Sequence, residues 1–394
     1  MTASITAREA PAAADLGGLF APFDCAGLSL RNRVAMSPMT RCRSPGGLAG
    51  EDSEAYYTRR ARGGVGLIFT EGVGVDHPAA LGVGSMGEQN MPELHGGEAL
   101  ARWRAIVEAV HAEGTPIVPQ LWHQGPVRMP GTGRHPDAPS SRPSGIWGPA
   151  GGVNNAIPFY LDQVRPEGEA MSDADIAAVI DGFARSAANA AAVGFDGIAL
   201  HGGHGYLIDS FLWSATNRRR DRWGGDARGR ALFGAEVVRA VRRAAPRLPL
   251  FFRISQWKLQ DYEARLADTP AALEALLAPL VDAGVDVFDV SARRFDDPAF
   301  GDGGLSLAGW VKKLSGRTTI AVGSIGLDRE LRRSLSEPVA FEDNIARAAR
   351  GVETGEFDMI ALGRSLLADA AWVGKIEQRQ SPDPFTIRAL AEMV

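Results

Sequence analysis

Cysteine is scarce in this chain. Only Cys25 and Cys42 occur among 394 residues, which excludes a disulfide framework and is typical of a protein kept in a reducing cytoplasm. Apolar runs are also short of the roughly 18 residues that a membrane span needs, so we expect no membrane segment. Residues 1–15 lack the basic and apolar stretches of a secretory signal. We expect them to form a flexible leader, followed by one domain over residues 16–394.

An excess of positive charge is also missing. The net charge is −5, from 42 basic and 47 acidic residues, and the basic residues do not gather in one stretch. This distribution argues against nucleic acid as a partner. Neither a P-loop nor a Gly-x-Gly-x-x-Gly motif follows a strand candidate, so a Rossmann site is not expected. The proportions of 45% hydrophobic and 23% charged residues are those of a globular protein.

Short apolar runs alternate with helical patterns along the whole chain. Ser172 and Asp175 stand at the spacing of a capping box at the start of the third helix. The strand candidates are 34–37, 65–70, 116–120, 197–201, 250–254, 285–290, 318–322 and 359–362. The helix candidates are 53–62, 98–113, 173–193, 227–245, 271–283, 306–315 and 341–354.

This alternation predicts a parallel sheet built from βαβ units. Eight units in series favour a single closed (β/α)8 TIM barrel, with a doubly wound open sheet as the alternative. Residues 123–171 are rich in proline and glycine and follow the third strand. We therefore expect a long loop insertion that overhangs the carboxyl-end mouth of the barrel.

Polar residues follow the strand candidates at the end where barrels carry their active sites. The segment from His201 to Tyr206 places two imidazoles and a phenol on one glycine-rich turn. The pair His201 and His204 could bind zinc with Asp209, could be buried structural histidines, or could donate to one substrate oxygen while Tyr206 supplies a proton. We prefer the third interpretation, without a metal.

Glycine-rich turns follow the seventh and eighth strand candidates, where barrels often bind phosphate. Backbone amides and one guanidinium would hold the phosphate there. These turns predict a phosphorylated cofactor, bound by Gly323, Ser324, Gly363 and Arg364.

At this point the sequence resembles the old yellow enzymes, which are flavin-dependent ene-reductases on a (β/α)8 barrel with bound FMN. The resemblance runs from about Leu30 to Trp372. It rests on the segments LRNRVAMSPMTRCRS, YYTRRARGGVGLIFTEG, QLWHQG, HGGHGYLIDSFLWSATNRRRDRWGG, FFRIS, AVGSIG and ALGRSLLADAAW.

The resemblance implies a role for individual residues. Thr40 would bond the flavin carbonyl near the reactive nitrogen, as in the branch of the family that carries threonine there. His201 and His204 would bind the substrate oxygen, Tyr206 would be the proton donor, and Trp122 would lie near flavin and substrate. The residues implied to bind FMN are Pro38, Met39, Thr40, Gly72, Gln120, Arg253, Gly323, Ser324, Gly363 and Arg364.

The implied activity is reduction of the C=C bond of an α,β-unsaturated carbonyl or nitro compound. FMN would be bound tightly but not covalently, and NADPH or NADH would be the reductant. A flavin-dependent desaturase or dehydrogenase of a cyclic ketone remains an alternative, and a zinc-dependent barrel hydrolase is a more distant one. We expect a monomer or homodimer in the cytoplasm.

The chain departs from the family pattern in two places. The family commonly has a Ser-Pro-type sequence after the arginine of the fifth strand, where this chain has Ile254–Ser255–Gln256–Trp257–Lys258. Ser324 stands where asparagine or alanine is common. These departures bear on the substrate pocket. Candidates for shaping it are Trp147, Phe159 and Trp257, whereas Cys42 is interpreted as a packing residue.

Overall fold

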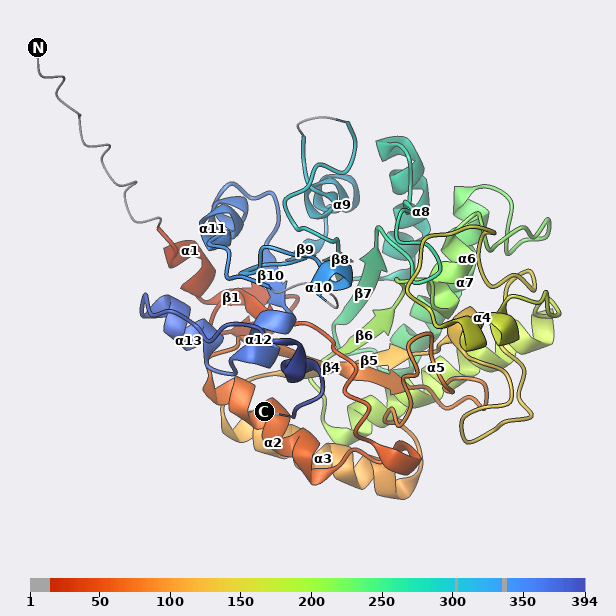
Figure 1. The fold of residues 1–394 in the computed structure, drawn as a ribbon, viewed down its shortest axis with the longest axis horizontal. Coiled ribbons are helices and arrows are strands. Elements are labelled where there is room, and N and C mark those ends of the chain that lie inside the picture. The colour runs from red at the N-terminus through yellow and green to blue at the C-terminus, as the bar shows by residue number, and fades with distance from the viewer. Residues whose placement is uncertain (1–14, 302–303, 335–338, 394) are drawn as a thin grey trace, which may run out of the picture.

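A closed barrel of eight parallel strands forms the centre of the molecule (Figure 1). The computed structural model describes residues 15–301, 304–334 and 339–393, so the expected leader lies outside the described residues except for Asp15. The barrel order is β10-β3-β4-β5-β6-β7-β8-β9, which confirms the predicted (β/α)8 architecture. Its strands are β3 (Val34–Met36), β4 (Leu67–Gly74), β5 (Ile117–Trp122), β6 (Ile198–His201), β7 (Leu250–Ser255), β8 (Val287–Ser291), β9 (Thr318–Val322) and β10 (Met359–Leu362).

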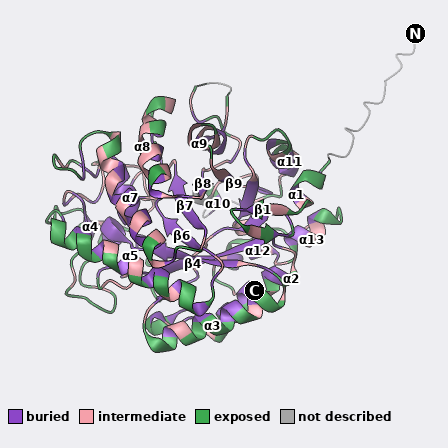
Figure 2. Ribbon diagram, turned by 180° about the vertical axis from the view of Figure 1, so that it is seen from behind, coloured by how far each residue is buried: buried purple, intermediate pink, exposed green. Residues whose placement is uncertain are grey.

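The strands are buried on both faces, as Figure 2 shows by their purple colour. One apolar cluster fills the barrel interior, where the rings of Phe69 and Phe251 meet edge to face at 5.1 Å. A larger cluster lies between the strands and the surrounding helices. This double burial explains why the strands are nearly continuous apolar runs rather than alternating ones.

A two-stranded hairpin, β1 (Phe23–Cys25) and β2 (Leu28–Leu30), covers the amino ends of the barrel strands. Cys25 and Leu30 belong to the interior cluster together with Leu67 and Met359, which are the first residues of their strands. Burial raises the pKa of the Cys25 thiol to about 12, so it is an inert packing group. The hairpin therefore closes the end of the barrel opposite the predicted site.

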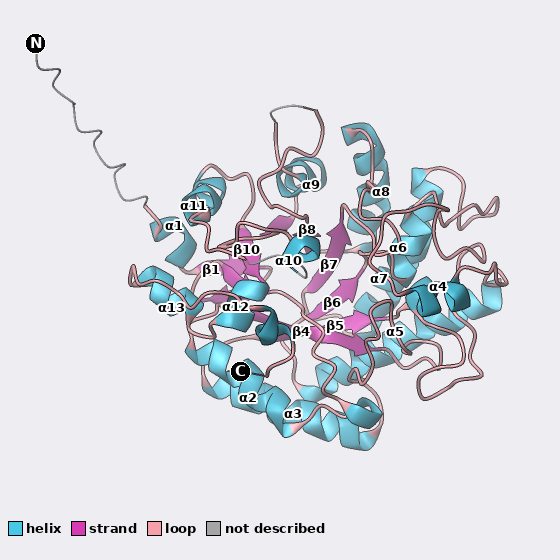
Figure 3. Cartoon of the chain, viewed as in Figure 1, coloured by secondary structure: helices cyan, strands magenta, loops and turns pink. Residues whose placement is uncertain are grey.

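The expected helices surround the barrel (Figure 3). The predicted capping box is present, because the Asp175 amide donates to Ser172 Oγ and the Ser172 amide donates to the Asp175 carboxylate. The seven predicted helices are α2 (Glu51–Arg62), α3 (Gly97–Ala112), α5 (Asp173–Val193), α7 (Ala227–Ala244), α8 (Pro270–Ala283), α9 (Leu307–Ser315) and α11 (Ile345–Glu353).

By length and composition alone, α5 could cross a membrane. It is instead the connection between β5 and β6, and it packs against the neighbouring helices α3 and α7. Its buried face includes Val179, Phe183 and Ala187. These contacts are those of a barrel helix.

Several boundaries differ from the sequence prediction. The second barrel strand runs to Gly74 instead of ending at Thr70, because its pairing with β5 shifts register between Phe69 and Gly72 and then resumes. The helix expected over 341–354 begins only at Ile345. Short helices that the sequence analysis did not predict are α1 (Gly17–Phe20), α4 (Pro158–Val164), α6 (Leu207–Leu212), α10 (Leu331–Ser334), α12 (Arg364–Ala368) and α13 (Trp372–Glu377), with 3-10 turns η1 (Pro45–Gly47), η2 (Gly125–Val127) and η3 (Ile387–Leu390).

The insertion over residues 123–171 packs as a small cluster beside the mouth. Trp147 is buried against Tyr160, whose hydroxyl accepts from the indole N–H at 3.2 Å and donates to the Val127 carbonyl at 2.7 Å. Phe159 is 64% exposed. The expectation that Trp147 and Phe159 shape the pocket is therefore wrong, because one packs within the insertion and the other faces solvent.

Candidate active site

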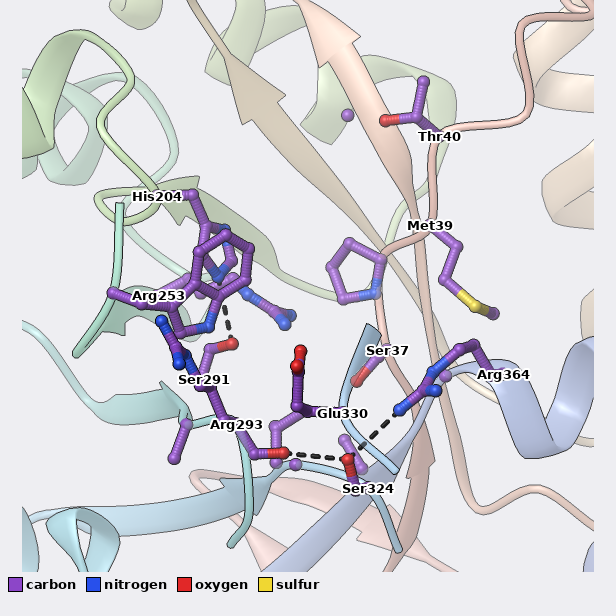
Figure 4. A pocket seen from close by; sticks show the side chains of 18 of the residues that line it. Ser37, Met39, Thr40, His204, Arg253, Ser291, Arg293, Ser324, Glu330 and Arg364 are labelled. Carbon is purple, nitrogen blue, oxygen red and sulfur yellow. Dashed lines mark hydrogen bonds between the residues drawn. The ribbon is translucent and has the colours of Figure 1, made fainter. Parts of the chain in front are cut away.

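A cavity of about 500 Å³ lies at the carboxyl ends of the barrel strands. In Figure 4, Ser324 and Arg364 are joined by a hydrogen bond and lie across the cavity from His204. All residues that the sequence analysis assigned to cofactor or substrate line this one space: Pro38, Met39, Thr40, Gly72, Gln120, Trp122, His201, His204, Tyr206, Arg253, Gly323, Ser324, Gly363 and Arg364.

The two histidines of the β6 turn face each other. His201 Nε2 and His204 Nδ1 are 3.4 Å apart, and the other His204 nitrogen, Nε2, lies 2.9 Å from Ser291 Oγ. Desolvation, reinforced by the charge of Arg253, holds the pKa of both imidazoles well below the usual range. Both rings are therefore neutral at pH 7, and each has one N–H to donate.

The backbone of this turn is unusual. His204 has φ +62° and Gly205 has φ +81°, so two successive residues adopt the left-handed conformation. At Gly202, an added Cβ would lie 2.3 Å from the Phe252 ring. Glycine is required here because the turn presses against β7, and the turn aims both imidazoles into the cavity.

Tyr206 follows at the N-cap position of α6. Its ring lies 4.8 Å from that of His201 and 4.9 Å from that of Trp122, both edge to face. Desolvation raises the pKa of the phenol well above its ordinary value. The hydroxyl therefore keeps its proton at neutral pH and can act as a hydrogen-bond donor and as a weak acid.

The segment after Arg253, which departs from the family pattern, forms hydrogen bonds with this turn. The His204 amide donates to Ser255 Oγ at 2.6 Å, and the Leu259 amide donates to the His204 carbonyl at 3.1 Å. Gln260 Nε2 donates to the Gly205 carbonyl at 2.9 Å. The segment 255–260 thus holds the backbone that carries the second imidazole.

A buried ion pair completes the support. Lys258 Nζ lies 2.8 Å from Asp209 Oδ1, and neither side chain has any exposed surface. Asp209 also accepts the Gly205 amide at 2.7 Å, and Lys258 donates to the Ser255 carbonyl at 3.1 Å. Asp209 is therefore engaged away from the imidazoles, which removes the carboxylate from the zinc interpretation. Among the described residues, no group of three potential ligands is placed to hold a metal ion.

Arg253 has a partner that the sequence analysis missed. Its guanidinium donates to Asp289 at 2.7 Å, on the neighbouring strand β8, and the two residues are paired in the sheet register. Burial raises the pKa of Asp289 while the arginine lowers it. An aspartate within an otherwise apolar strand was the available signal. Arg253 therefore reaches the cavity as one partner of a buried ion pair.

The opposite end of the cavity is rich in hydrogen-bond donors. Arg364 donates to Ser324 Oγ at 3.1 Å, to the Arg329 carbonyl at 2.8 Å and to Ser334. Burial lowers the pKa of Arg364 to about 10, so it stays charged at neutral pH. Gly323 has φ +152°, and an added Cβ would lie 2.7 Å from the Ala292 carbonyl oxygen.

These residues fit FMN. Gln120 Nε2 is buried without a hydrogen-bond partner among the described residues, as an amide awaiting a ring carbonyl would be. Arg364 offers a charged donor for a phosphate at the other end, beside Ser324. A group with a polar ring edge and a phosphorylated tail matches both ends of the cavity.

Comparison with known proteins decides the family. The family model described as the NADH:flavin oxidoreductase / NADH oxidase family, Oxidored_FMN, matches residues 18–382. The chain belongs to this family. Membership confirms the resemblance to old yellow enzymes and assigns the chain to the NAD(P)H-dependent flavin oxidoreductases, with FMN as cofactor.

Relatives of this flavin oxidoreductase include the NADH oxidase of Thermoanaerobacter brockii, 32% identical over 91% of this chain and 50% of the relative. Another is the putative 12-oxophytodienoate reductase 6 of Oryza sativa subsp. japonica, 35% identical over 57% of this chain and 54% of the relative. The chain thus matches about half the length of these curated relatives. Among solved structures, morphinone reductase in complex with tetrahydroNAD is similar with a TM-score of 0.76, at 25% identity, over 95% of this chain and 94% of that one.

Three arginines join the carboxyl-terminal segment to the cavity wall, a feature that sequence motifs did not reveal. Arg41 donates to the carbonyls of Ala389 and Glu392, Arg43 donates to that of Ala391, and Arg59 donates to that of Met393. The segment places Leu390 in the cavity lining. No local pattern in residues 387–393 signals this contact.

Glu71 also belongs to the site's support. Its carboxylate accepts the Arg41 amide at 2.8 Å, and this amide follows Thr40 directly. Burial raises the pKa of Glu71 to about 7. The ionised form is thus disfavoured in the folded protein, so folding stability falls as pH rises from the unfolded pKa, near 4.5, to about 7.

Glu71→Gln removes this titration. The free energy of unfolding of the variant, measured by denaturant titration, is expected to lose the part of its pH dependence between about 4.5 and 7. Glu113→Gln is a suitable control, because Glu113 forms an ion pair with the exposed Arg62. An unchanged pH slope in Glu71→Gln would contradict the assignment.

Arg364→Ala is expected to lower FMN occupancy, because it removes the only side-chain cation hydrogen-bonded to Ser324 among the described residues. Flavin absorbance relative to protein absorbance, after dialysis, measures the occupancy. Arg62→Ala, remote from the cavity and 65% exposed, is the matched control. Full occupancy in Arg364→Ala would refute the phosphate assignment.

Proposed function

We propose that this protein is an FMN-dependent ene-reductase that uses NADH or NADPH to reduce the C=C bond of α,β-unsaturated carbonyl or nitro compounds. The observation that carries this proposal is the pair of facing nitrogens, His201 Nε2 and His204 Nδ1, 3.4 Å apart in the FMN-family cavity. Two nitrogens at this separation can both reach one substrate oxygen.

The imidazoles would act by binding and polarising. An oxygen between His201 Nε2 and His204 Nδ1 would accept a hydrogen bond from each, which draws electron density from the conjugated C=C bond. For both to donate, the His204 proton must be on Nδ1, and Ser291 can favour this tautomer by donating its hydroxyl to Nε2 at 2.9 Å. Neutral donors suit an oxygen that carries only partial charge before reaction.

The remaining residues would hold the cofactor and supply the proton. Thr40, in the position of the threonine branch, Gly72, Gln120 and Arg253 would contact the flavin ring, with Pro38 and Met39 beside it. When bound, non-covalently, FMN would supply the hydride. Tyr206 would give its hydroxyl proton to the substrate α-carbon, and the raised pKa of the phenol keeps that proton available.

Small molecules are the partners that this site fits. A cytoplasmic location is part of the proposal, supported by the two cysteines, which are both free thiols. A monomer or homodimer remains our prediction for the oligomeric state.

An anaerobic titration tests the function. NADH or NADPH is expected to bleach the flavin of the purified protein, and cyclohexenone is expected to restore its colour with formation of cyclohexanone. Bleaching by cyclohexanone but not by NAD(P)H would overturn the proposal in favour of a desaturase. Stoichiometric zinc without flavin would favour the hydrolase.

A further inference from the structure

Arg293 is a cavity residue to which neither the family resemblance nor the proposed mechanism assigns a role. It follows β8 in the turn after Ser291 and lines the cavity. Its backbone is fixed, because its carbonyl accepts from Ser324 Oγ at 2.8 Å (Figure 4). The guanidinium lies over the Tyr262 ring, with Cζ 5.7 Å from the ring centroid.

The guanidinium of Arg293 has no hydrogen-bond acceptor or ion-pair partner among the described residues, and its Nη2 is buried without one. Each of the other arginines that line the cavity has at least one acceptor: Asp289 for Arg253, Ser324 and the Arg329 carbonyl for Arg364, and carboxyl-terminal carbonyls for Arg41. Burying half of a guanidinium without an acceptor is unfavourable in free energy, and an anion that forms hydrogen bonds with it would offset this desolvation penalty.

The neighbouring Arg294 has acceptors for its guanidinium, so the lack of an acceptor is specific to Arg293 and not common to the turn. Arg294 makes two bonds of 3.0 Å to the Glu342 carboxylate and a third of 3.2 Å to the Asp328 carbonyl. It faces the outer connection and is fully paired. Arg293 faces the cavity and is left with its donors available.

An aromatic surface connects Arg293 to the histidine pair. The His204 ring lies 4.5 Å from the Trp257 ring, which in turn lies 5.4 Å from that of Tyr262. Arg293 follows over the Tyr262 face. A ligand with its carbonyl oxygen at the histidines could place an apolar chain along this surface and an anionic end at Arg293.

We propose that Arg293 is an anion-binding residue that selects a molecule carrying a carboxylate or phosphate at the far end from the histidine pair. The inference rests on the proposed function, because it takes the histidines as the site of the carbonyl. The planar guanidinium matches both anions through paired N–H donors. The anion could belong to the unsaturated substrate or to the nicotinamide dinucleotide.

The substrate arm compares acids with esters. Cyclohexenones that carry a carboxylate on an alkyl chain of varied length are assayed beside their methyl esters, in the parent protein, Arg293→Met and Arg293→Lys. If the substrate carries the anion, the parent is expected to favour the acid by roughly 10- to 100-fold in kcat/KM. Arg293→Met should abolish this ratio, and Arg293→Lys should retain part of it.

The dinucleotide arm follows flavin reduction alone. If the anion belongs to the dinucleotide, Arg293→Met should weaken the apparent binding of NADH or NADPH by a similar factor, while the acid-to-ester ratio is unchanged and near one in all three proteins. Titration of the oxidised protein with phenols that carry a carboxylate or its ester gives dissociation constants independent of turnover. FMN absorbance reports whether the variants keep their cofactor.

Different outcomes test the proposed function and the role of Arg293. Parent protein that reduces no neutral ester would contradict the proposed function itself. Neutral esters reduced normally, with Arg293→Met changing neither the acid-to-ester ratio nor dinucleotide binding, would overturn the role of Arg293 alone.

Discussion

Tyr206→Phe is expected to slow reduction of an enone by the reduced protein by about 10²- to 10⁴-fold, which is the usual contribution of a positioned acid. The rate of flavin reduction by NADH or NADPH should be unchanged, because that step needs no proton from Tyr206. The ring contacts with His201 and Trp122 remain in the variant, so substrate binding is expected to change little. Stopped-flow absorbance measures the two half-reactions separately.

Tyr160→Phe is the matched control. Tyr160 is also a buried phenol with a raised pKa, but its hydroxyl donates to the Val127 carbonyl within the insertion and it does not line the cavity. It should leave both half-reactions unaffected. Equal enone reduction by the parent and Tyr206→Phe would exclude Tyr206 as the proton donor and would leave water or another group in that role.

The second large effect is expected on stability. Lys258→Met leaves Asp209 buried without its cation, and breaking a fully buried pair in this way typically costs about 3–5 kcal/mol. Burial lowers the pKa of Lys258 and raises that of Asp209, so each charge depends on the other. Thermal and denaturant unfolding of the variant should show this loss.

The double variant Asp209→Leu/Lys258→Met separates stability from positioning. Replacing both charges with apolar groups should restore much of the stability. It also removes the acceptor of the Gly205 amide, so phenol binding at the histidine pair should be weaker than in the parent protein. Unimpaired stability in Lys258→Met would refute the ion pair, and full recovery of phenol affinity in the double variant would show that the pair does not position the turn.

Much of the site could be predicted because barrel topology turns positions along the chain into positions in space. Most strand candidates contributed a site residue at or near the carboxyl end, such as Gln120, His201 or Arg253, and the closed barrel brings these ends together. The glycines of the β6 turn were equally visible in the sequence. Position and residue type indicated only which side chains could donate hydrogen bonds or protons. The family resemblance then assigned each of them a specific role.

The rest depended on contacts between distant segments. The pairing of Lys258 with Asp209 and of Arg253 with Asp289 joins residues more than thirty positions apart. The polar Asp289 within an apolar strand was a signal of burial, but it did not name its partner. The register shift in β4 moved a strand end beyond Thr70, since the strand continues past an irregularity that breaks its pattern. Phe159 was wrongly placed because an aromatic residue in a long loop can face either the cavity or solvent.

The hairpin at the amino ends of the barrel strands has a kinetic consequence. With Cys25 and Leu30 packed into the barrel interior, that end offers no route to the flavin site. Under the proposed function, the nicotinamide dinucleotide and the unsaturated substrate would both enter from the carboxyl-end mouth and would compete for the cavity beside the histidine pair. A high concentration of either reactant would then block binding of the other, so an excess of the dinucleotide or of the unsaturated substrate would lower the steady-state rate.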